Sequence, residues 1–307
     1  MMKNEKEERD IVFVILHYIS ITDTNTAIQS IEDNIDTESY HIVVVDNGSP
    51  NKTGLELQKE YEGSQKVSVI LSENNLGFAR GNNLGIAYAR ENYEFAFLAV
   101  LNNDIYLLEK DLVKKLKEEY GKSGFAVLGP MILTAAGQCN INPGRSRVIS
   151  RQEVEHKIAR YKKQIFFGKI YLGWFYEWLL KVYHKYIYLP RNAAKAKNKI
   201  YTERREMVQL HGCFLAFSPQ YFRRLQGFDE RTFLYMEEDI LFAKIVENQL
   251  KSVYLPDIMV FHNEDRSTDE SAKHNDRKKK LFMRTNYVNS AKVLLEVLEE
   301  MKTAEAE

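Results

Sequence analysis

The feature that most restricts the fold is a series of short apolar segments, each followed by a segment of helical length. The first, at residues 11–18 (IVFVILHY), is rich in β-branched side chains and has no polar alternation, as is typical of a strand covered on both faces. Similar runs recur at residues 41–46, 66–71 and 95–101. Because strands alternate with helices, we expect an α/β fold with a mostly parallel central sheet.

Polar side chains stand at the carboxyl end of each of these apolar runs. In open parallel sheets, ligands bind beyond the carboxyl ends of the strands. The sequence therefore predicts a polar cleft at this edge, lined by His17, by Asp46 to Ser49, by Asn74 and Asn75, and by Asn102 to Asp104.

The character of the chain changes after Pro130. Basic and aromatic side chains dominate residues 145–205, which predicts a helical insertion, and strand patterns return at 208–219 and 252–262. A helix is expected at 278–302. We expect a catalytic domain over residues 1–265, with a donor half at about 11–130 and an acceptor half at about 131–265 that contains the insertion, followed by a C-terminal loop and helix at 266–307.

Charge and cysteine content exclude several classes of protein. The 43 basic residues balance 43 acidic ones, so no overall field favours nucleic acid, and we expect none as a partner. Cys139 and Cys213 form no metal-binding cluster and are expected to be reduced thiols. The charged N-terminal segment is not typical of a signal peptide, so we expect a cytoplasmic protein. Lysines interrupt the aromatic segment 165–189, which predicts contact with a membrane surface rather than a spanning helix.

The acidic residues in the predicted cleft each have two interpretations. Asp46 is a turn-capping residue or an acceptor for the imide N–H of a pyrimidine base. Asp104 caps the next helix or binds Mg²⁺ or Mn²⁺ together with a diphosphate, and His262 at a later strand end is a structural residue or a second metal ligand. Glu237 to Asp239 begin a helix, where acids are favourable, or include a general base.

The glycine-rich segment 74–85 contains neither a dinucleotide-binding G-x-G-x-x-G nor a P-loop. Five stretches in order instead resemble the family 2 glycosyltransferases, in particular rhamnosyltransferase-like enzymes of bacterial surface polysaccharide synthesis. They are VVVDNGSPN, NNLGFARGNNLGIAYA, VLNNDI, LHGCFLAFSPQYFRRLQGFDERTFLYMEEDILF and YLPDIMVFH.

The resemblance implies a GT-A fold, a UDP- or dTDP-linked sugar donor, a divalent cation (Mn²⁺ or Mg²⁺) and inversion at the anomeric carbon. By position, Asp46 resembles the contact to the nucleotide base, Asp104 the last acid of the D-x-D metal motif, and Glu238 the catalytic base. The motif reads Asn102-Asn103-Asp104, so it retains one carboxylate. The further candidates are Glu237 and Asp239 for catalysis; His17, Asn75, Gly81, Asn83, Asn102 and Asn103 for donor binding; His211, Gly212 and Arg266 for the acceptor or diphosphate; and His262 for the metal.

Two other functions remain alternatives. A GT-A-like scaffold without catalysis is favoured by the two asparagines of the metal motif. A sugar nucleotidyltransferase has a similar sheet but usually carries a basic, glycine-rich loop after the first strand, where this chain reads HYISITDT. We expect a glycan or lipid-linked acceptor, and the insertion is expected to contact the inner face of a membrane, to cover the acceptor cleft or to form a homodimer.

Overall fold

Nine strands form one mixed sheet in the computed structural model, which describes residues 6–135, 137, 141–183, 201–263 and 276–306. The strand order is β3-β2-β1-β4-β8-β6-β9-β5, and β7 pairs with β9 outside this order. The strands are β1 Glu7–His17, β2 Tyr40–Asp46, β3 Val67–Leu71, β4 Tyr93–Asn102, β5 Ile105–Leu107, β6 Val127–Thr134, β7 Arg205–Glu206, β8 Phe214–Phe217 and β9 Ser252–His262.

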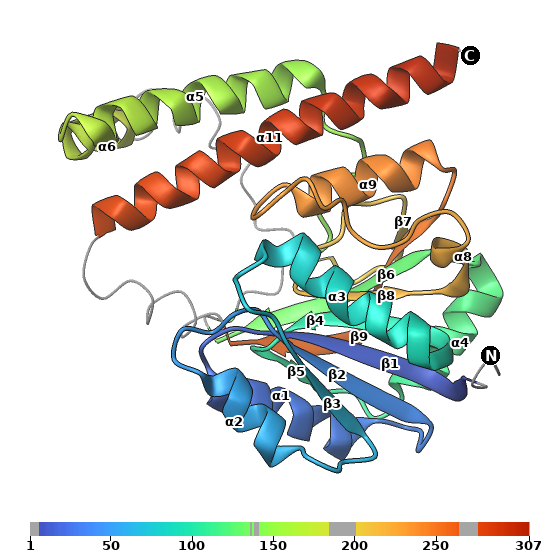
Figure 1. Ribbon diagram of the computed structural model, residues 1–307. Coiled ribbons are helices and arrows are strands. Elements are labelled where there is room, and N and C mark those ends of the chain that lie inside the picture. Colours follow the sequence, from blue (N-terminus) through green and yellow to red (C-terminus); the bar gives the residue numbers. More distant parts are fainter. Residues whose placement is uncertain (1–5, 136, 138–140, 184–200, 264–275, 307) are drawn as a thin grey trace, which may run out of the picture.

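Parallel pairing brings the polar strand ends together. Strand β1 pairs in parallel with β2 and β4, and β2 pairs in parallel with β3. The register sets His17 beside Asp46 and Leu16 beside Asn102, so these strands end at one edge of the sheet (Figure 1). The long pairings are parallel, and the expected α/β fold with a mostly parallel sheet is confirmed.

Short antiparallel strands complete the other half of the sheet. Strand β8 lies between β4 and β6 and is antiparallel to both, and β5 is antiparallel to β9. The sequence pattern did not predict β5, which has only three residues. Strand β8 occupies 214–217, a small part of the strand expected at 208–219.

Helices cover both faces of the sheet, which explains the uninterrupted apolar runs. Alternate residues of β1 enter opposite cores: Phe13 packs in the core beneath α1, α2 and α4, whereas Val14 packs beneath α3 and α9. The helices are α1 Ile21–Asn34, α2 Thr53–Glu60, α3 Gly77–Asn92, α4 Leu112–Ser123, α5 Arg151–Lys169, α6 Gly173–Tyr183, α8 Pro219–Phe222, α9 Glu237–Glu247 and α11 Asp276–Ala306.

A third layer lies above α9. Helices α5 and α11 run side by side there, and their apolar side chains form a separate core with α9 (Figure 1). The expected helical insertion and C-terminal helix are thus present, although residues 184–200 lie outside the described part of the chain. The domain boundaries stay a prediction. Among the described residues, no helix is both long and apolar enough to cross a bilayer.

The contact of α3 with the sheet gives a first testable prediction. A Cβ atom at Gly85 would lie 2.4 Å from Val14 Cγ1 and 2.8 Å from Val45 Cγ2. We expect Gly85→Ala to lower the free energy of unfolding by ~1–3 kcal/mol through overpacking, even though alanine is the better helix former. Urea unfolding measures the change.

Gly121 in α4 provides the matched control, because no atom lies within 4 Å of a Cβ placed there. We expect Gly121→Ala to leave stability unchanged or to raise it by up to ~1 kcal/mol. Equal effects of the two substitutions would contradict the close approach of α3 to β1 and β2.

Candidate active site

Asp46 lies at the end of β2, with its side chain against the start of α2. It is buried, and its Oδ1 accepts a hydrogen bond of 3.2 Å from the backbone N–H of Ser49. A Cβ atom at Gly54 would lie 2.1 Å from Asp46 Oδ2, so only glycine permits this contact. The first turn of α2 is a favourable environment for a carboxylate, because the helix macrodipole is positive there. Asp46 is therefore held at the predicted cleft in a fixed orientation.

His17 is the buried neighbour of Asp46. Its Nδ1 is 2.6 Å from Thr24 Oγ1, its Nε2 is 2.9 Å from Thr53 Oγ1, and Nε2 is 3.9 Å from Asp46 Oδ1. Burial lowers the pKa of His17 to about 4, so its ring is neutral at pH 7. These contacts are internal to the protein, and the nucleotide contact expected for His17 stays a prediction.

Asn47 was expected at the cleft only as part of the segment from Asp46 to Ser49, without a role of its own. It is buried, its Nδ2 donates to Gly77 O at 3.1 Å and to Asn75 Oδ1 at 3.2 Å, and its Oδ1 accepts from the N–H of Leu76 at 2.8 Å. Asn47 thus fixes the loop before α3 over the end of β2. In the sequence it looks like an ordinary turn residue, because its partners are about thirty positions away.

The other candidates on α3 have contacts within the protein. A Cβ atom at Gly81 would lie 2.6 Å from Leu16 Cδ1, so this glycine allows α3 to pack on β1. The Asn83 amide donates to Phe228 O at 2.9 Å, and its oxygen accepts from the N–H of Phe228 at 2.8 Å. The structure gives both residues a packing role, and their contact with a donor stays a prediction.

Asp104 lies in the two-residue turn between β4 and β5. The preceding Asn103 is buried, and its amide donates to Thr24 Oγ1 at 3.1 Å and to Ser20 O at 3.3 Å, which fixes the turn. The N–H of Asn102 donates to Cys213 O at 3.0 Å. Asp104 is also buried, but its Oδ1 accepts no hydrogen bond within the described part of the chain. A buried carboxylate oxygen without a donor is costly, which points to a ligand at this position.

Asp104 begins a row of polar groups drawn from four segments of the chain. Its Oδ1 is 3.4 Å from His262 Nε2, since β5 pairs with the end of β9. The rings of His262 and His211 are 6.2 Å apart between centroids, and His211 Nδ1 is 3.6 Å from Glu238 Oε1. The N–H of Gly212 donates to the same Glu238 oxygen at 2.6 Å. The sequence candidates Asp104, His262, His211, Gly212 and Glu238 therefore lie together.

A third buried asparagine, Asn142, positions His211. Asn142 Oδ1 accepts a hydrogen bond of 3.2 Å from the N–H of His211, and Asn142 Nδ2 donates to Pro130 O at 2.8 Å. The side chain is fully buried. The sequence offered no signal for this role, because Asn142 lies in a loop and its partner is far along the chain.

The three acids at the start of α9 have different surroundings. Asp239 forms an ion pair with Arg145, and its side chain is 12% exposed. Glu237 is largely buried, and desolvation raises its pKa to about 7. The Glu238 side chain is 37% exposed, and its Oε1 accepts the hydrogen bond from the N–H of Gly212. Glu238 is thus the acid most accessible to a substrate.

The backbone before these acids is strained. Tyr235 and Met236 have φ angles of 73° and 68°, which L-residues with large side chains rarely adopt. Such conformations cost ~1–3 kcal/mol each and are concentrated at functional sites. This double left-handed turn sets the direction in which α9 begins and therefore where Glu238 points.

Within the described residues, no group of three or more His, Cys, Asp or Glu side chains is arranged to hold a metal ion. Asp104 and His262 are the pair available among the predicted ligands. Arg266, which we expected to contact the diphosphate, lies outside the described residues.

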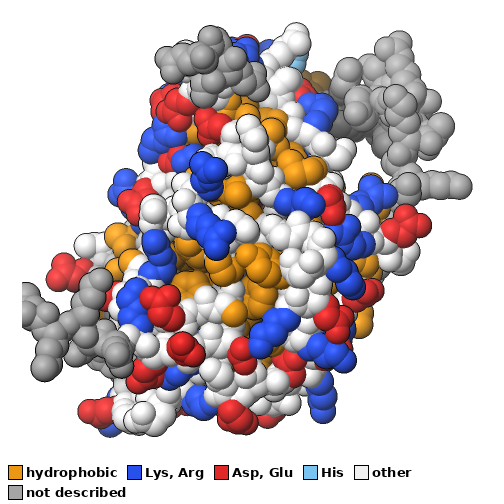
Figure 2. Space-filling view, turned by 90° about the vertical axis from the view of Figure 1, so that its right-hand side faces the viewer, with side chains coloured by type: hydrophobic (Ala, Val, Ile, Leu, Met, Phe, Trp, Pro, Cys, Tyr) orange, Lys and Arg blue, Asp and Glu red, His pale blue; other side chains and the backbone are white. Residues whose placement is uncertain are grey.

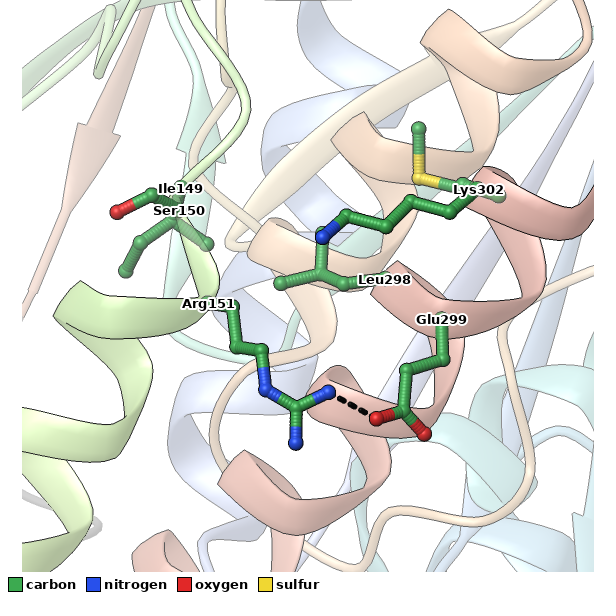
Figure 3. Close-up of a pocket in the computed structure, with 7 residues that line it drawn as sticks. Ile149, Ser150, Arg151, Leu298, Glu299 and Lys302 are labelled. Carbon is green, nitrogen blue, oxygen red and sulfur yellow. Dashed lines mark hydrogen bonds and ion pairs between the residues drawn. The ribbon is translucent and has the colours of Figure 1, made fainter. Parts of the chain in front are cut away.

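A cavity of about 250 Å³ lies elsewhere, between the start of α5 and the end of α11. Ser150 and Arg151 line it on one side and Leu298, Glu299 and Lys302 on the other, with an ion pair between Arg151 and Glu299 (Figure 3). None of the site residues described above lines this cavity.

The family's sequence model, described as glycosyl transferase family 2, matches residues 13–199, which is more than half of the 307-residue chain. This chain belongs to glycosyl transferase family 2. The matched region of this family member contains Asp46 and Asp104 but ends before Glu238 and His262. The placement of those two residues in the site therefore rests on the geometry.

Solved structures with the same fold agree with this family. GalNAc-T7, solved with UDP, GalNAc and Mn²⁺, superposes with a TM-score of 0.53 at 15% identity over 82% of this chain and 43% of that one. Residues 1–349 of TarS from S. aureus, in complex with UDP-GlcNAc, give a TM-score of 0.51 at 12% identity over 91% of this chain and 66% of that one. The chain of this family 2 member thus spans less than two thirds of the length of either. These likenesses confirm the expected GT-A fold. No curated protein matched the chain by sequence.

The raised pKa of Glu237 predicts a pH dependence of stability. The folded state keeps the Glu237 proton up to about pH 7, whereas an unfolded chain releases it near the ordinary glutamate pKa. The unfolded state therefore binds fewer protons in this interval, so the free energy of unfolding falls as the pH rises from about 4.5 to about 7. We expect the decrease in the free energy of unfolding between about pH 5 and pH 8 to be smaller in Glu237→Gln than in the wild type, by on the order of 2 kcal/mol. Urea unfolding at a series of pH values measures this difference.

Burial also raises the pKa of Asp239, so the variant should keep a smaller slope of the same sign. Glu247→Gln at the exposed end of α9 is the matched control and should retain the wild-type profile. Identical pH profiles for wild type and Glu237→Gln would show that Glu237 is ionised in the folded protein.

Proposed function

We propose that this protein transfers a sugar from a UDP- or dTDP-linked donor to a hydroxyl group of a glycan or lipid-linked acceptor. The observation that carries the proposal is the row Asp104, His262, His211 and Glu238 at the edge of the sheet where Asp46 also lies. At one end of the row, Asp104 and His262 suit a diphosphate with its cation. At the other end, the carboxylate of Glu238 suits a general base. The structures of TarS and GalNAc-T7, solved with UDP or UDP-GlcNAc, support a nucleotide-linked donor.

In this proposal the donor lies along the carboxyl edge of the parallel strands. The Asp46 carboxylate accepts the imide N–H of the pyrimidine base, an interaction that favours uracil and thymine over cytosine. Asn75, Asn102 and Asn103 line the path from the base toward Asp104. The buried Asn47 acts indirectly, by holding the loop that carries Asn75.

Asp104 and His262 fit a divalent cation as part of its shell. A buried carboxylate oxygen without a hydrogen bond, 3.4 Å from an imidazole nitrogen, provides the O and N ligands that Mn²⁺ accepts, and Mg²⁺ commonly completes its shell with water and phosphate oxygens. When bound, the ion neutralises negative charge on the diphosphate. One protein carboxylate is sufficient if the diphosphate supplies the remaining charge.

Glu238 is proposed as the general base of an inverting displacement. It takes the proton of the acceptor hydroxyl while that oxygen forms a bond to the anomeric carbon, and the bond from that carbon to the diphosphate oxygen breaks. The N–H of Gly212 holds one carboxylate oxygen, and His211 lies beside it, so the side chain is oriented before substrate binds. Asp239 is less suitable as the general base, because its carboxylate forms an ion pair with Arg145.

The resemblance to rhamnosyltransferase-like enzymes supports a finer proposal. The sugar is a hexose or deoxyhexose, the product belongs to a bacterial surface polysaccharide, and the enzyme works in the cytoplasm. A screen of purified nucleotide sugars with Mn²⁺ or Mg²⁺, read as released nucleoside diphosphate and as thermal stabilisation, tests the function. Failure of every donor to react or to stabilise the protein would favour the non-catalytic scaffold.

Glu238→Gln tests the base. Glutamine keeps an oxygen that can accept from Gly212 but cannot take a proton, so we expect turnover to fall by ~10²-fold or more with donor affinity retained. Initial rates and donor binding are measured on the same samples. Glu247→Gln, in the same helix but exposed, is the control and should keep wild-type turnover. Wild-type turnover in Glu238→Gln would move the role to Asp239.

Asp104→Asn tests the metal ligand. Removing the single carboxylate while keeping the size of the side chain should raise the Mn²⁺ concentration needed for half-maximal activity by about tenfold or more. The exposed Asp111→Asn, at the start of α4, is the control and should leave the metal requirement unchanged. A wild-type Mn²⁺ requirement in Asp104→Asn would exclude Asp104 as a ligand.

A further inference from the structure

The tip of the upper helical layer is unusually apolar at its surface. It consists of the end of α5, all of α6 and the start of α11. Twelve large apolar side chains are strongly exposed in the described part of the chain, and ten of them lie on this tip. They are Phe166, Ile170, Tyr171, Leu172, Trp174, Phe175, Trp178, Leu179, Phe282 and Met283.

Contacts between α6 and its neighbours show that the tip is an ordered surface. Arg277 Nε donates to Gly168 O at 2.8 Å, and its guanidinium lies 3.7 Å from the centre of the Tyr171 ring. Arg284 and Lys280 both pair with Glu177, at 2.6 Å and 3.3 Å. The start of α11 is therefore joined to α6 at several points, and the exposed aromatic side chains are presented by a folded element.

Basic residues surround these apolar side chains. Residues 162–182 and 276–285 contain nine lysines and arginines and two acids, Glu177 and Asp276. On the opposite side of the molecule, by contrast, Lys and Arg side chains are intermixed with Asp and Glu (Figure 2). The tip thus combines exposed aromatic and aliphatic groups with an excess of positive charge.

A hollow in the tip repeats this combination. A cavity of about 290 Å³ is lined by Tyr171, Trp174 and Glu177 from the α6 side and by Arg277, Lys280 and Arg284 from α11, so three cations face one carboxylate there. Aromatic rings next to cationic groups suit a headgroup that carries a phosphate above hydrocarbon chains. Helix α6 has eleven residues, so it is long enough to lie in a membrane interface and too short to span one.

We propose that this tip docks on the surface of a membrane that contains anionic lipids. Trp174, Trp178 and their apolar neighbours enter the headgroup region, and the lysines and arginines contact lipid phosphates. A polar protein partner would leave the tryptophans without an apolar environment, whereas a bilayer interface accommodates both kinds of group. Docking does not depend on the proposed glycosyl transfer.

The placement of the tip has a consequence for the site. In Figure 1, α6 and the start of α11 lie on the same side of the molecule as the carboxyl ends of β1, β2 and β4. A protein docked through α6 therefore has the carboxyl ends of these strands, and the candidate site beside them, on the membrane-facing side, which suits a lipid-linked acceptor.

The two tryptophans of the chain, Trp174 and Trp178, both belong to α6, so tryptophan fluorescence, excited at wavelengths that tyrosine does not absorb, reports on the tip alone. They are 70% and 54% exposed. We expect the emission of the full chain to shift to shorter wavelength on addition of vesicles of phosphatidylcholine mixed with phosphatidylglycerol. The shift should be weaker with pure phosphatidylcholine and should decrease at high salt.

Two pairs of substitutions separate the contributions of apolar and of charged side chains to membrane binding. Trp174→Ala with Trp178→Ala should weaken co-sedimentation with anionic vesicles by about tenfold or more. The matched control is Leu55→Ala with Leu108→Ala, two residues that are 54% and 45% exposed outside the tip, and it should bind as the wild type. Lys278→Gln with Lys279→Gln should weaken binding about fivefold for each lysine, whereas Lys59→Gln with Lys122→Gln should not.

Three results would overturn the proposal. The first is no fluorescence shift or co-sedimentation with anionic vesicles at low salt. The second is equal binding to neutral and anionic vesicles. The third is a wild-type protein that binds no vesicles and forms a dimer in gel filtration, whereas the double tryptophan variant is a monomer. This result would assign the tip to a contact between two copies. The thermal unfolding midpoint of each variant verifies that it is folded.

Discussion

The pairing of β5 with the end of β9 is the contact on which the site depends. It sets Ile105 beside His262 and thereby brings His262 Nε2 to 3.4 Å from Asp104 Oδ1. The remaining polar groups extend this pair, because His211 lies beside His262 and Glu238 beside His211. A three-residue strand is weak by itself. Here it is held by Tyr106, whose hydroxyl donates to the buried Asp23 at 3.2 Å, and by Leu107, whose N–H donates to Ser30 Oγ at 3.0 Å.

Buried amides hold the loops of the site where strands alone would not. Asn47, Asn103 and Asn142 each hold a segment that is distant in the chain: the loop before α3, the start of α1 and the segment at His211, respectively. An asparagine amide has both donors and an acceptor, so one side chain can satisfy several buried backbone groups. It does so without adding charge to the candidate site.

Much of the fold could be predicted from the sequence because its strongest signals are local. The continuous apolar run of β1 reflects helices on both faces of the sheet, and the polar residues after β1, β2 and β4 reflect the parallel register that aligns these ends. Strand β5 was missed, because three residues carry no periodicity, and β8 was expected to be longer than it is. Donor binding by Asn83 stays a prediction, and no local pattern could show that its amide also pairs with the backbone of Phe228, a partner 145 positions away.

The sequence by itself determined that Asp46 ends a buried strand, that Asp104 closely follows one, and that Glu237, Glu238 and Asp239 begin a helix. Only the tertiary structure decided how the three acids at the start of α9 differ from one another. Successive residues of a helix point about 100° apart, so each of the three meets a different part of the protein. Asp239 meets Arg145, Glu237 is largely withdrawn from solvent, and Glu238 meets the N–H of Gly212. The positions of Arg145 and Gly212 depend on segments far along the chain, and therefore no local pattern could assign the three roles.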